Sequence, residues 1–190
     1  MRIVAGRHRG RKIIAPDSME IRPTSDRVRE SVFNILEHGD LGKGGVSPLT
    51  GARVLDAFCG TGAFGLEALS RGAEHSTFLD IRNTSLDLCR ETIIALNEQT
   101  RTDLLRTDCL KSVCHAEPYD LVFIDPPYSA NLAQPAIVNL MRSGWISDEA
   151  VCVIETGPDE ALNIADAFTL LEDRKYGKTR IRISRYAKAN

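Results

Sequence analysis

Apolar residues recur in two rhythms along the chain after Ala52. Short apolar runs alternate with longer segments in which apolar residues return every three or four positions. The first pattern is typical of buried strands and the second of helices with one buried face. Their alternation predicts βαβ units and a mostly parallel sheet. Seven strands are expected at residues 52–58, 75–81, 102–108, 119–125, 150–156, 168–177 and 178–187, and helices at residues 63–72, 83–98, 131–144 and 158–167.

The first 51 residues follow a different pattern. Residues 2–14 hold short apolar runs around glycine-rich basic turns, which predicts a small hairpin. Helical spacing of apolar residues then predicts a helix from about Ser25 to His38, followed by a glycine-rich linker at 39–51. We therefore expect an N-terminal hairpin-and-helix extension, residues 1–45, followed by the main domain, residues 46–190.

Composition suits one compact domain. The chain has 190 residues, of which 43% are hydrophobic, enough for a sizeable core. No apolar run approaches the about 20 residues that span a bilayer, and the charged N-terminus lacks the apolar stretch of a secretory signal. The five cysteines include no CxxC pair, which favours reduced thiols, a cytoplasmic protein and no metal site.

The net charge of -2 conceals a segregation of charge. Residues 1–30 carry eight Lys/Arg and four Asp/Glu, a balance of +4, and residues 174–190 carry seven Lys/Arg and no acid, a balance of +7. The segment between them, residues 31–173, has nine bases and 22 acids, a balance of -13. Since both basic ends also have strand patterning, we expect two folded basic arms that meet in space and hold a polyanion.

A glycine-rich loop follows the first strand of the main domain. Gly60, Gly62 and Gly65 fit G-x-G-x-x-G between a strand and a helix, a pattern that by itself indicates only close approach to a ligand or a tight turn. Asp80 ends the next strand, at the distance where a ribose-binding acid belongs. These features alone fit a nicotinamide or flavin enzyme equally well.

Asp56 argues against a dinucleotide. It precedes the first glycine by four residues and would repel a pyrophosphate, whereas a ligand with a cationic head group would be attracted. S-adenosylmethionine has an ammonium group, a sulfonium and no phosphate. Asp56 could hold its amino group directly or through a water, Asp80 its ribose hydroxyls and Asp108, after the third strand, its adenine amine. Each acid alone could simply cap the following helix; three in register favour a cofactor site.

Asp125-Pro126-Pro127-Tyr128 ends the fourth strand. Asp125 and the carbonyls of the two prolines offer acceptors without backbone donors, and proline fixes the direction of the chain. Such a turn suits an exocyclic amine, both of whose hydrogens must be accepted, and Tyr128 offers a face for base stacking. The acceptors would hold the amine nitrogen with its lone pair toward the methyl group. A plain turn is the alternative interpretation.

The motifs VLDAFCGTG and DPPY together resemble the amino-directed, S-adenosylmethionine-dependent methyltransferases of the seven-stranded Rossmann-like class, which have helices on both faces of the sheet. RIVAGRHRGRKI and RPTSDRVRESVFNIL narrow the resemblance to the bacterial RsmD-type family, which methylates guanine N2 in 16S ribosomal RNA. The resemblance covers nearly the whole chain. It implies cofactor contacts at Asp56, Phe58, Gly60, Thr61, Gly62, Asp80, Ile81, Asp108, Cys109 and Thr24, and catalytic roles at Asp125, Pro126, Pro127 and Tyr128.

The implied partner is ribosomal RNA in an assembled or assembling small subunit. Because both basic arms belong to one chain, we expect a monomer to suffice for binding it. Basic residues would follow the RNA backbone, giving affinity rather than sequence recognition. The candidates are Arg7, Arg9, Arg11, Lys12, Arg22, Arg29, Lys178 and Arg180. Three alternatives stay open: an adenine-N6 enzyme, for which DPPY is equally suited; a nucleotide-binding oxidoreductase; and an RNA-binding module without catalysis.

Overall fold

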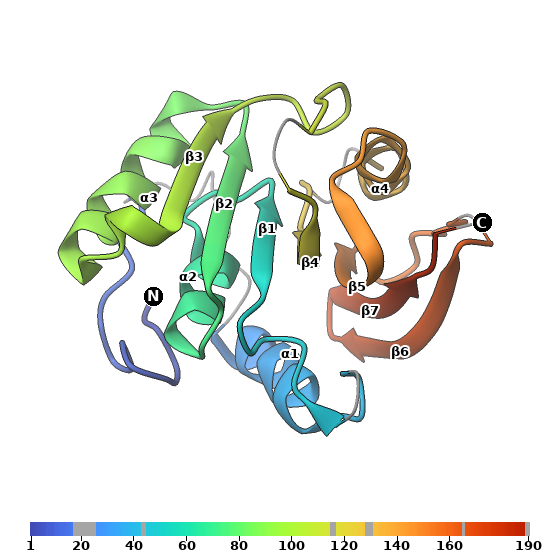
Figure 1. The fold of residues 1–190 in the computed structure, drawn as a ribbon, viewed down its shortest axis with the longest axis horizontal. Coiled ribbons are helices and arrows are strands. Elements are labelled where there is room, and N and C mark those ends of the chain that lie inside the picture. The colour runs from blue at the N-terminus through green and yellow to red at the C-terminus, as the bar shows by residue number, and fades with distance from the viewer. Residues whose placement is uncertain (17–25, 43–44, 115–116, 128–130, 165, 189–190) are drawn as a thin grey trace.

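A computed structural model of the protein describes residues 1–16, 26–42, 45–114, 117–127, 131–164 and 166–188. In chain order the elements are α1 (Asp26–His38), β1 (Arg53–Ala57), α2 (Ala63–Ser70), β2 (His75–Asp80), α3 (Asn83–Leu96), the short 3-10 helix η2 (Gln99–Arg101), β3 (Thr102–Arg106), β4 (Tyr119–Ile124), α4 (Ala133–Arg142), β5 (Ile146–Thr156), β6 (Phe168–Tyr176) and β7 (Thr179–Tyr186) (Figure 1).

All seven strands form one sheet, in the order β3-β2-β1-β4-β5-β7-β6. The first five are parallel to one another, β7 runs antiparallel to β5, and β6 pairs antiparallel with β7. The chain therefore reverses direction across the sheet between β1 and β4, the type of position where open α/β sheets bind ligands beyond the carboxyl ends of their strands. The predicted seven-stranded α/β fold is confirmed.

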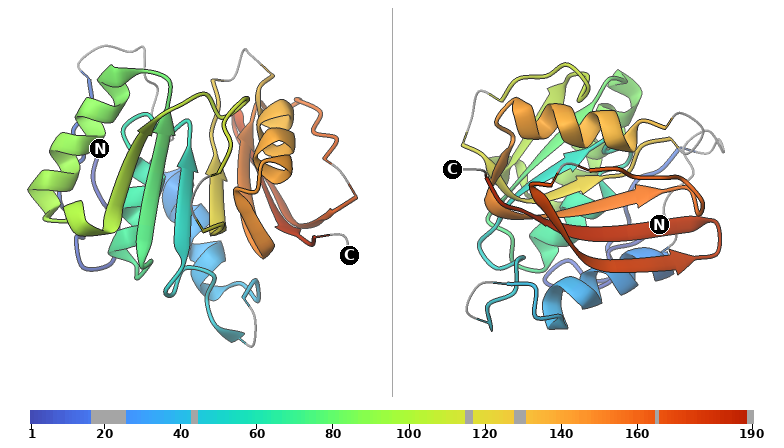
Figure 2. Two further views of the ribbon diagram at one scale, coloured as in Figure 1. Left: turned by 45° about the horizontal axis from the view of Figure 1, so that its top comes forward. Right: turned by 90° about the vertical axis from the view of Figure 1, so that its right-hand side faces the viewer.

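Helices cover both faces of the sheet (Figure 2). On one face α1 and α2 share a core with Val54, Phe123 and Val153 of the sheet, and α3 packs with α2 around Phe78. On the opposite face α4 packs on the alternate residues of the same strands, among them Ile124. This two-sided burial explains why the central strands are almost continuously apolar.

The N-terminal residues dock on α2 and α3. An antiparallel bridge joins Arg2 to Lys12, and Ile3 and Ile13 are buried in the core beneath. At the turn, Gly6 has a φ of 77° and a Cβ there would lie 1.9 Å from the Ser70 carbonyl oxygen. The hairpin is therefore confirmed, closed by a single bridge. The domain boundary between residues 45 and 46 stays a prediction. The segments before and after it share two hydrophobic cores.

Two predicted elements differ from the structure. No helix forms in the described residues between 158 and 167. Arg182 donates to the Glu160 carbonyl at 2.9 Å, and the Asn163 amide donates to Gln134 at 3.1 Å. These long-range bonds engage backbone groups that a helix would pair internally, so tertiary contacts override the local pattern. The other difference is β5, which begins at Ile146 rather than Ala150 and carries a register shift against β4.

None of the helices in the described parts of the chain is long and apolar enough to cross a membrane. The described residues also include no group of three or more His, Cys, Asp or Glu side chains arranged to hold a metal ion.

Candidate active site

The glycine-rich loop leaves β1 in an unusual backbone conformation. Phe58, Gly60 and Gly62 have φ values of 60°, 53° and 75°, in the left-handed region that glycine adopts freely and that costs a phenylalanine about 1 kcal/mol. At Gly62 a Cβ would lie 2.4 Å from the Cys89 sulfur of α3. The loop is therefore pressed against α3, which holds its backbone at the carboxyl end of β1.

Asp80 at the end of β2 fixes this loop. Its Oδ2 accepts from the Gly60 amide at 3.1 Å, and its Oδ1 accepts from the Arg82 amide at 2.8 Å. The Arg82 guanidinium lies 3.5 Å from the same Oδ1. The next residue, Ile81, leaves 60% of its surface exposed. A carboxylate beside exposed apolar surface is suited to hold a ribose and support a flat ring.

Asp56 lies beneath the loop and is only 2% exposed. Its Oδ2 accepts from the Gly65 amide at 2.9 Å. Burial raises the pKa of Asp56 to about 8, the negative charge of Asp80 adds to this, and the bond from Gly65 acts in the opposite direction. A cation bound above the loop would reverse the shift, because it stabilises the ionised form.

The third strand contributes a tight turn. The Asp108 carboxylate accepts from the Leu110 amide at 2.9 Å, and Lys111 lies 3.9 Å from its other oxygen. Cys109 is 2% exposed, and burial raises the pKa of its thiol to about 12. Thr61 of the glycine loop is buried too, at 4% exposure. The Cys109 and Thr61 side chains are therefore both buried, whereas Asp108 remains partly open.

The Asp125 turn begins beside the glycine loop. Ala57 of β1 pairs with Ile124 of β4, so Phe58 and Asp125 are the next residues along the two neighbouring strands. Asp125 is half-buried, Pro126 is buried and Pro127 is exposed. The structure thus brings the predicted cofactor loop and catalytic turn together. Tyr128, Thr24 and Arg22, which the prediction also included, lie outside the described residues.

The predicted RNA-binding residues fall into two groups. Arg7, Arg9, Arg11 and Lys12 are exposed on the N-terminal hairpin, although Arg7 also pairs with Glu98 at 3.0 Å. At the other edge of the sheet, Lys178 is exposed in the β6–β7 turn. Arg180 makes two 2.7 Å bonds to Asp173, which lower the pKa of that carboxyl below its ordinary value.

Two of these predictions are wrong. Arg29 is fully buried, bonded to Asp26 at 3.0 Å and lying 3.7 Å from Glu67, so its side chain cannot reach RNA. The hairpin also does not meet the C-terminal strands as expected, although α1, where the same arm ends, shares a core with them that includes Val28 and Ile181. The described hairpin residues pack on α2 and α3, whereas β6 and β7 form the far edge of the sheet beyond β5 (Figure 1).

Sequence reasoning missed Glu67 and Glu155. Glu67 of α2 is fully buried and accepts from the Val4 amide at 2.8 Å and the Ala5 amide at 3.0 Å, and no local pattern signals this role. Glu155 is a buried acid at the end of β5. It obeys the same strand-end rule that identified Asp56 and could have been found by it.

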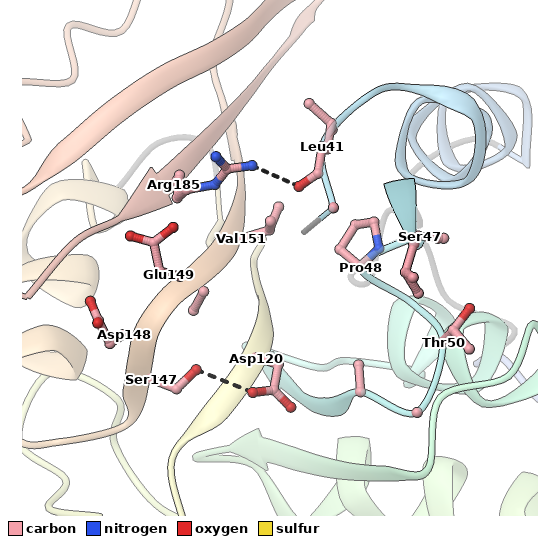
Figure 3. Close-up of a pocket in the computed structure, with 15 residues that line it drawn as sticks. Leu41, Ser47, Pro48, Thr50, Asp120, Ser147, Asp148, Glu149, Val151 and Arg185 are labelled. Carbon is pink, nitrogen blue, oxygen red and sulfur yellow. Dashed lines mark hydrogen bonds between the residues drawn. The ribbon is translucent and has the colours of Figure 1, made fainter. Parts of the chain in front are cut away.

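Two cavities lie outside this loop cluster. One, of about 310 Å³, opens between the linker after α1 and the start of β5; there Arg185 donates to the Leu41 carbonyl and Ser147 to Asp120 (Figure 3). It faces the amino ends of β1 and β4, away from the edge where parallel sheets bind ligands. The other, of about 580 Å³, lies between α4 and residues 159–161. Its lining begins at Asn131, six residues after Asp125 in the chain.

The arrangement at the carboxyl edge suits S-adenosylmethionine. Three carboxylates, Asp56, Asp80 and Asp125, end neighbouring strands around a loop of close backbone. They can accept hydrogen bonds from an ammonium group and from ribose hydroxyls, whereas a pyrophosphate has no hydrogen to donate to them. With the strand order, these features define a methyltransferase of the seven-stranded class that uses S-adenosylmethionine as its methyl donor.

Comparison with known proteins narrows this class to one family. The chain matches the family described as conserved hypothetical protein 95 over residues 1–185. It is 35% identical over 181 residues to the ribosomal RNA small subunit methyltransferase D of Haemophilus influenzae, covering 93% of this chain and 89% of that protein. The Escherichia coli protein of the same name is 33% identical over 186 residues, covering 96% and 88%. The solved structure of yhhF from Escherichia coli superposes with a TM-score of 0.84 at 29% identity, covering 98% of each chain. The protein belongs to this family, which excludes the oxidoreductase alternative.

Proposed function

We propose that this enzyme methylates the exocyclic N2 amine of one guanine in small-subunit ribosomal RNA. The observation that carries the proposal is the Asp125-Pro126-Pro127 turn, which begins beside the glycine-rich loop at the end of β4. The names of the similar proteins support ribosomal RNA of the small subunit as the substrate. The N2 position is our inference, because a turn of acceptors suits any aromatic amine.

Cofactor contacts are proposed for the residues around the loop. Asp56 would stabilise the amino group, with its burial favouring an intervening water, and Asp80 would accept from the ribose hydroxyls. Ile81, which is 60% exposed, would lie against the adenine, and Asp108 would accept from the adenine amine. The predicted contacts at Cys109 and Thr61 would involve the backbone, because both residues are buried.

S-adenosylmethionine, once bound, supplies a methyl group on a positively charged sulfur. The amine of guanine is a weak nucleophile because its lone pair is delocalised into the ring. Asp125 and the Pro126 carbonyl would each accept one of its hydrogens, which favours a pyramidal nitrogen with a directed lone pair. The Asp125 carboxylate also offsets the positive charge that develops on this nitrogen. To reach the turn, the target base would leave its stack.

The exposed basic residues of the N-terminal hairpin, Arg9 and Lys12 among them, would contact RNA phosphates. An assembled or assembling subunit as substrate, a cytoplasmic location and a monomeric state complete the proposal. Light scattering that shows a stable dimer at low concentration would contradict the monomer.

A direct test uses labelled S-adenosylmethionine and small subunits from cells that lack this gene. The RNA is digested and the labelled nucleoside identified by mass spectrometry. Wild type should yield N2-methylguanosine, Asp125→Ala should yield none, and Asp87→Ala, which removes an exposed acid of α3, should match wild type. Label in N6-methyladenine instead would support the adenine-N6 alternative, for which the same turn is suited. Label in no nucleic acid would refute the proposal.

A further inference from the structure

A second carboxylate lies next to Asp125 in the sheet. Ile124 of β4 pairs with Ile154 of β5, so Asp125 and Glu155 are the next residues along two adjacent parallel strands. Neighbouring strands are about 4.8 Å apart. Two carboxylates therefore stand side by side at the carboxyl edge, and only Asp125 has a role so far.

Both residues belong to the same face of the sheet. Phe123 and Val153, two positions earlier in each strand, share the core beneath α1 and α2. Because side chains alternate along a strand, Asp125 and Glu155 are directed to this face as well. Asp56 follows the same rule from Val54 of β1. The target amine and this second acid would thus meet on one side of the sheet.

Glu155 is deeply buried for a carboxylate. Its exposure is 1%, and the Thr179 hydroxyl donates to its Oε1 at 3.5 Å. The preceding residues on this face, Val151 and Val153, show that an apolar side chain fills such a position without desolvating a charge. A carboxylate at this position therefore needs an explanation other than packing against α1 and α2.

Guanine presents two adjacent donors on its pairing edge, the N1 hydrogen and the N2 amine. Adenine presents its amine next to N1, which is an acceptor. We propose, building on the proposed function, that Glu155 accepts the N1 hydrogen of the target guanine while Asp125 accepts from N2. The paired carboxylates match guanine and repel adenine, so Glu155 is a specificity residue that excludes adenine from a turn equally suited to it.

The test compares two substrates that share the reacting amine. Small subunits are reconstituted with RNA that carries either guanosine or 2,6-diaminopurine at the target position. Diaminopurine keeps the 2-amino group but has an acceptor at N1. The kcat/KM values for 2-amino methylation, measured by mass spectrometry in competition, give a preference ratio that does not depend on the folded fraction of enzyme. The variants are Glu155→Gln and Glu155→Ala, with Glu74→Gln, an exposed acid before β2, as the matched control.

Wild type and the control should prefer guanosine by about 100-fold or more, because an unmatched buried acceptor is penalised strongly. In Glu155→Gln the amide can also donate to N1, so the preference should fall by about tenfold or more. Glu155→Ala should lower it similarly, and single-turnover conditions with excess enzyme keep weak activity measurable. An unchanged preference in both variants would overturn the role of Glu155 and leave the proposed function intact. Absence of N2-methylguanosine with wild type would instead overturn the proposed function.

Discussion

Replacing Asp56 with asparagine is expected to remove a pH-dependent penalty on folding. Burial raises the pKa of Asp56 from 3.8 to about 8. Between these values the folded protein binds more protons than the unfolded chain, so its stability falls as pH rises through this window. Each pKa unit is worth about 1.36 kcal/mol. The penalty therefore grows by about 3 kcal/mol between about pH 5 and about pH 7.5 and is complete above pH 8.

Urea unfolding measures this difference. Wild type should lose about 3 kcal/mol of unfolding free energy over that interval relative to Asp56→Asn, since the amide cannot ionise. Asp87→Asn, a change at an exposed position of α3, should follow wild type. Parallel pH curves for wild type and Asp56→Asn would refute the claim that Asp56 is protonated in the folded protein at neutral pH.

The same shift links cofactor binding to proton release. If the amino group of S-adenosylmethionine binds near Asp56, its positive charge lowers the pKa of that carboxyl again. Binding at pH 7 should then release close to one proton. Calorimetric titrations in two buffers with different ionisation heats would detect it, and Asp56→Asn should abolish the difference. If wild type gave equal binding heats in the two buffers, the amino group of the cofactor would not bind near Asp56.

Five other substitutions test the surrounding structure and the RNA-binding surface. Gly62→Ala should destabilise the protein by about 2 kcal/mol and weaken cofactor binding, because its φ is 75° and its Cβ would meet a thiol at 2.4 Å. Gly10→Ala is the control, because its φ is 81° but its Cβ would lie in open space; it should lower stability by about 1 kcal/mol and leave cofactor affinity unchanged. If both variants lost the same stability in thermal melting and the same affinity in cofactor titration, the packing argument for Gly62 would be refuted. Glu67→Ala should lower the free energy of unfolding in urea by about 3–5 kcal/mol, because it leaves the buried Arg29 without its acidic partner. A decrease of less than about 1 kcal/mol would refute that. Arg9→Ala and Lys12→Ala should each flatten the salt dependence of RNA affinity by about one unit of slope, whereas an unchanged slope would remove the hairpin from the interface.

Much of the fold was predictable because its signals are local. Strands that are buried on both faces appear in the sequence as short apolar runs. The acids Asp56, Asp80 and Asp125 can be recognised because each lies at or directly after the end of such a run. The parallel sheet then brings these positions to one edge without further information. The cofactor loop and the catalytic turn could therefore be identified together from the sequence.

What sequence reasoning missed depends on contacts between distant segments. Arg29 reads as a surface cation of an amphipathic helix, but a partner 38 positions later, Glu67, draws it into the core. Residues 158–167 have a helical composition, but Arg182 of β7 donates a hydrogen bond to the Glu160 carbonyl. Neither partner can be inferred from spacing along the chain, because each pairing joins segments that are distant in sequence and adjacent only in the folded protein.

The docking of the N-terminal hairpin has a consequence for the order of folding. Its anchors lie 63 and 91 positions further along the chain: Val4 bonds to Glu67 at 2.8 Å, and Arg7 pairs with Glu98 at 3.0 Å. During synthesis the hairpin would thus leave the ribosome well before the segments that fix it, since closing such long loops precedes any gain from the contacts. A newly made chain would acquire its hairpin only after α2 and α3 exist, so an incompletely folded enzyme would lack this basic surface.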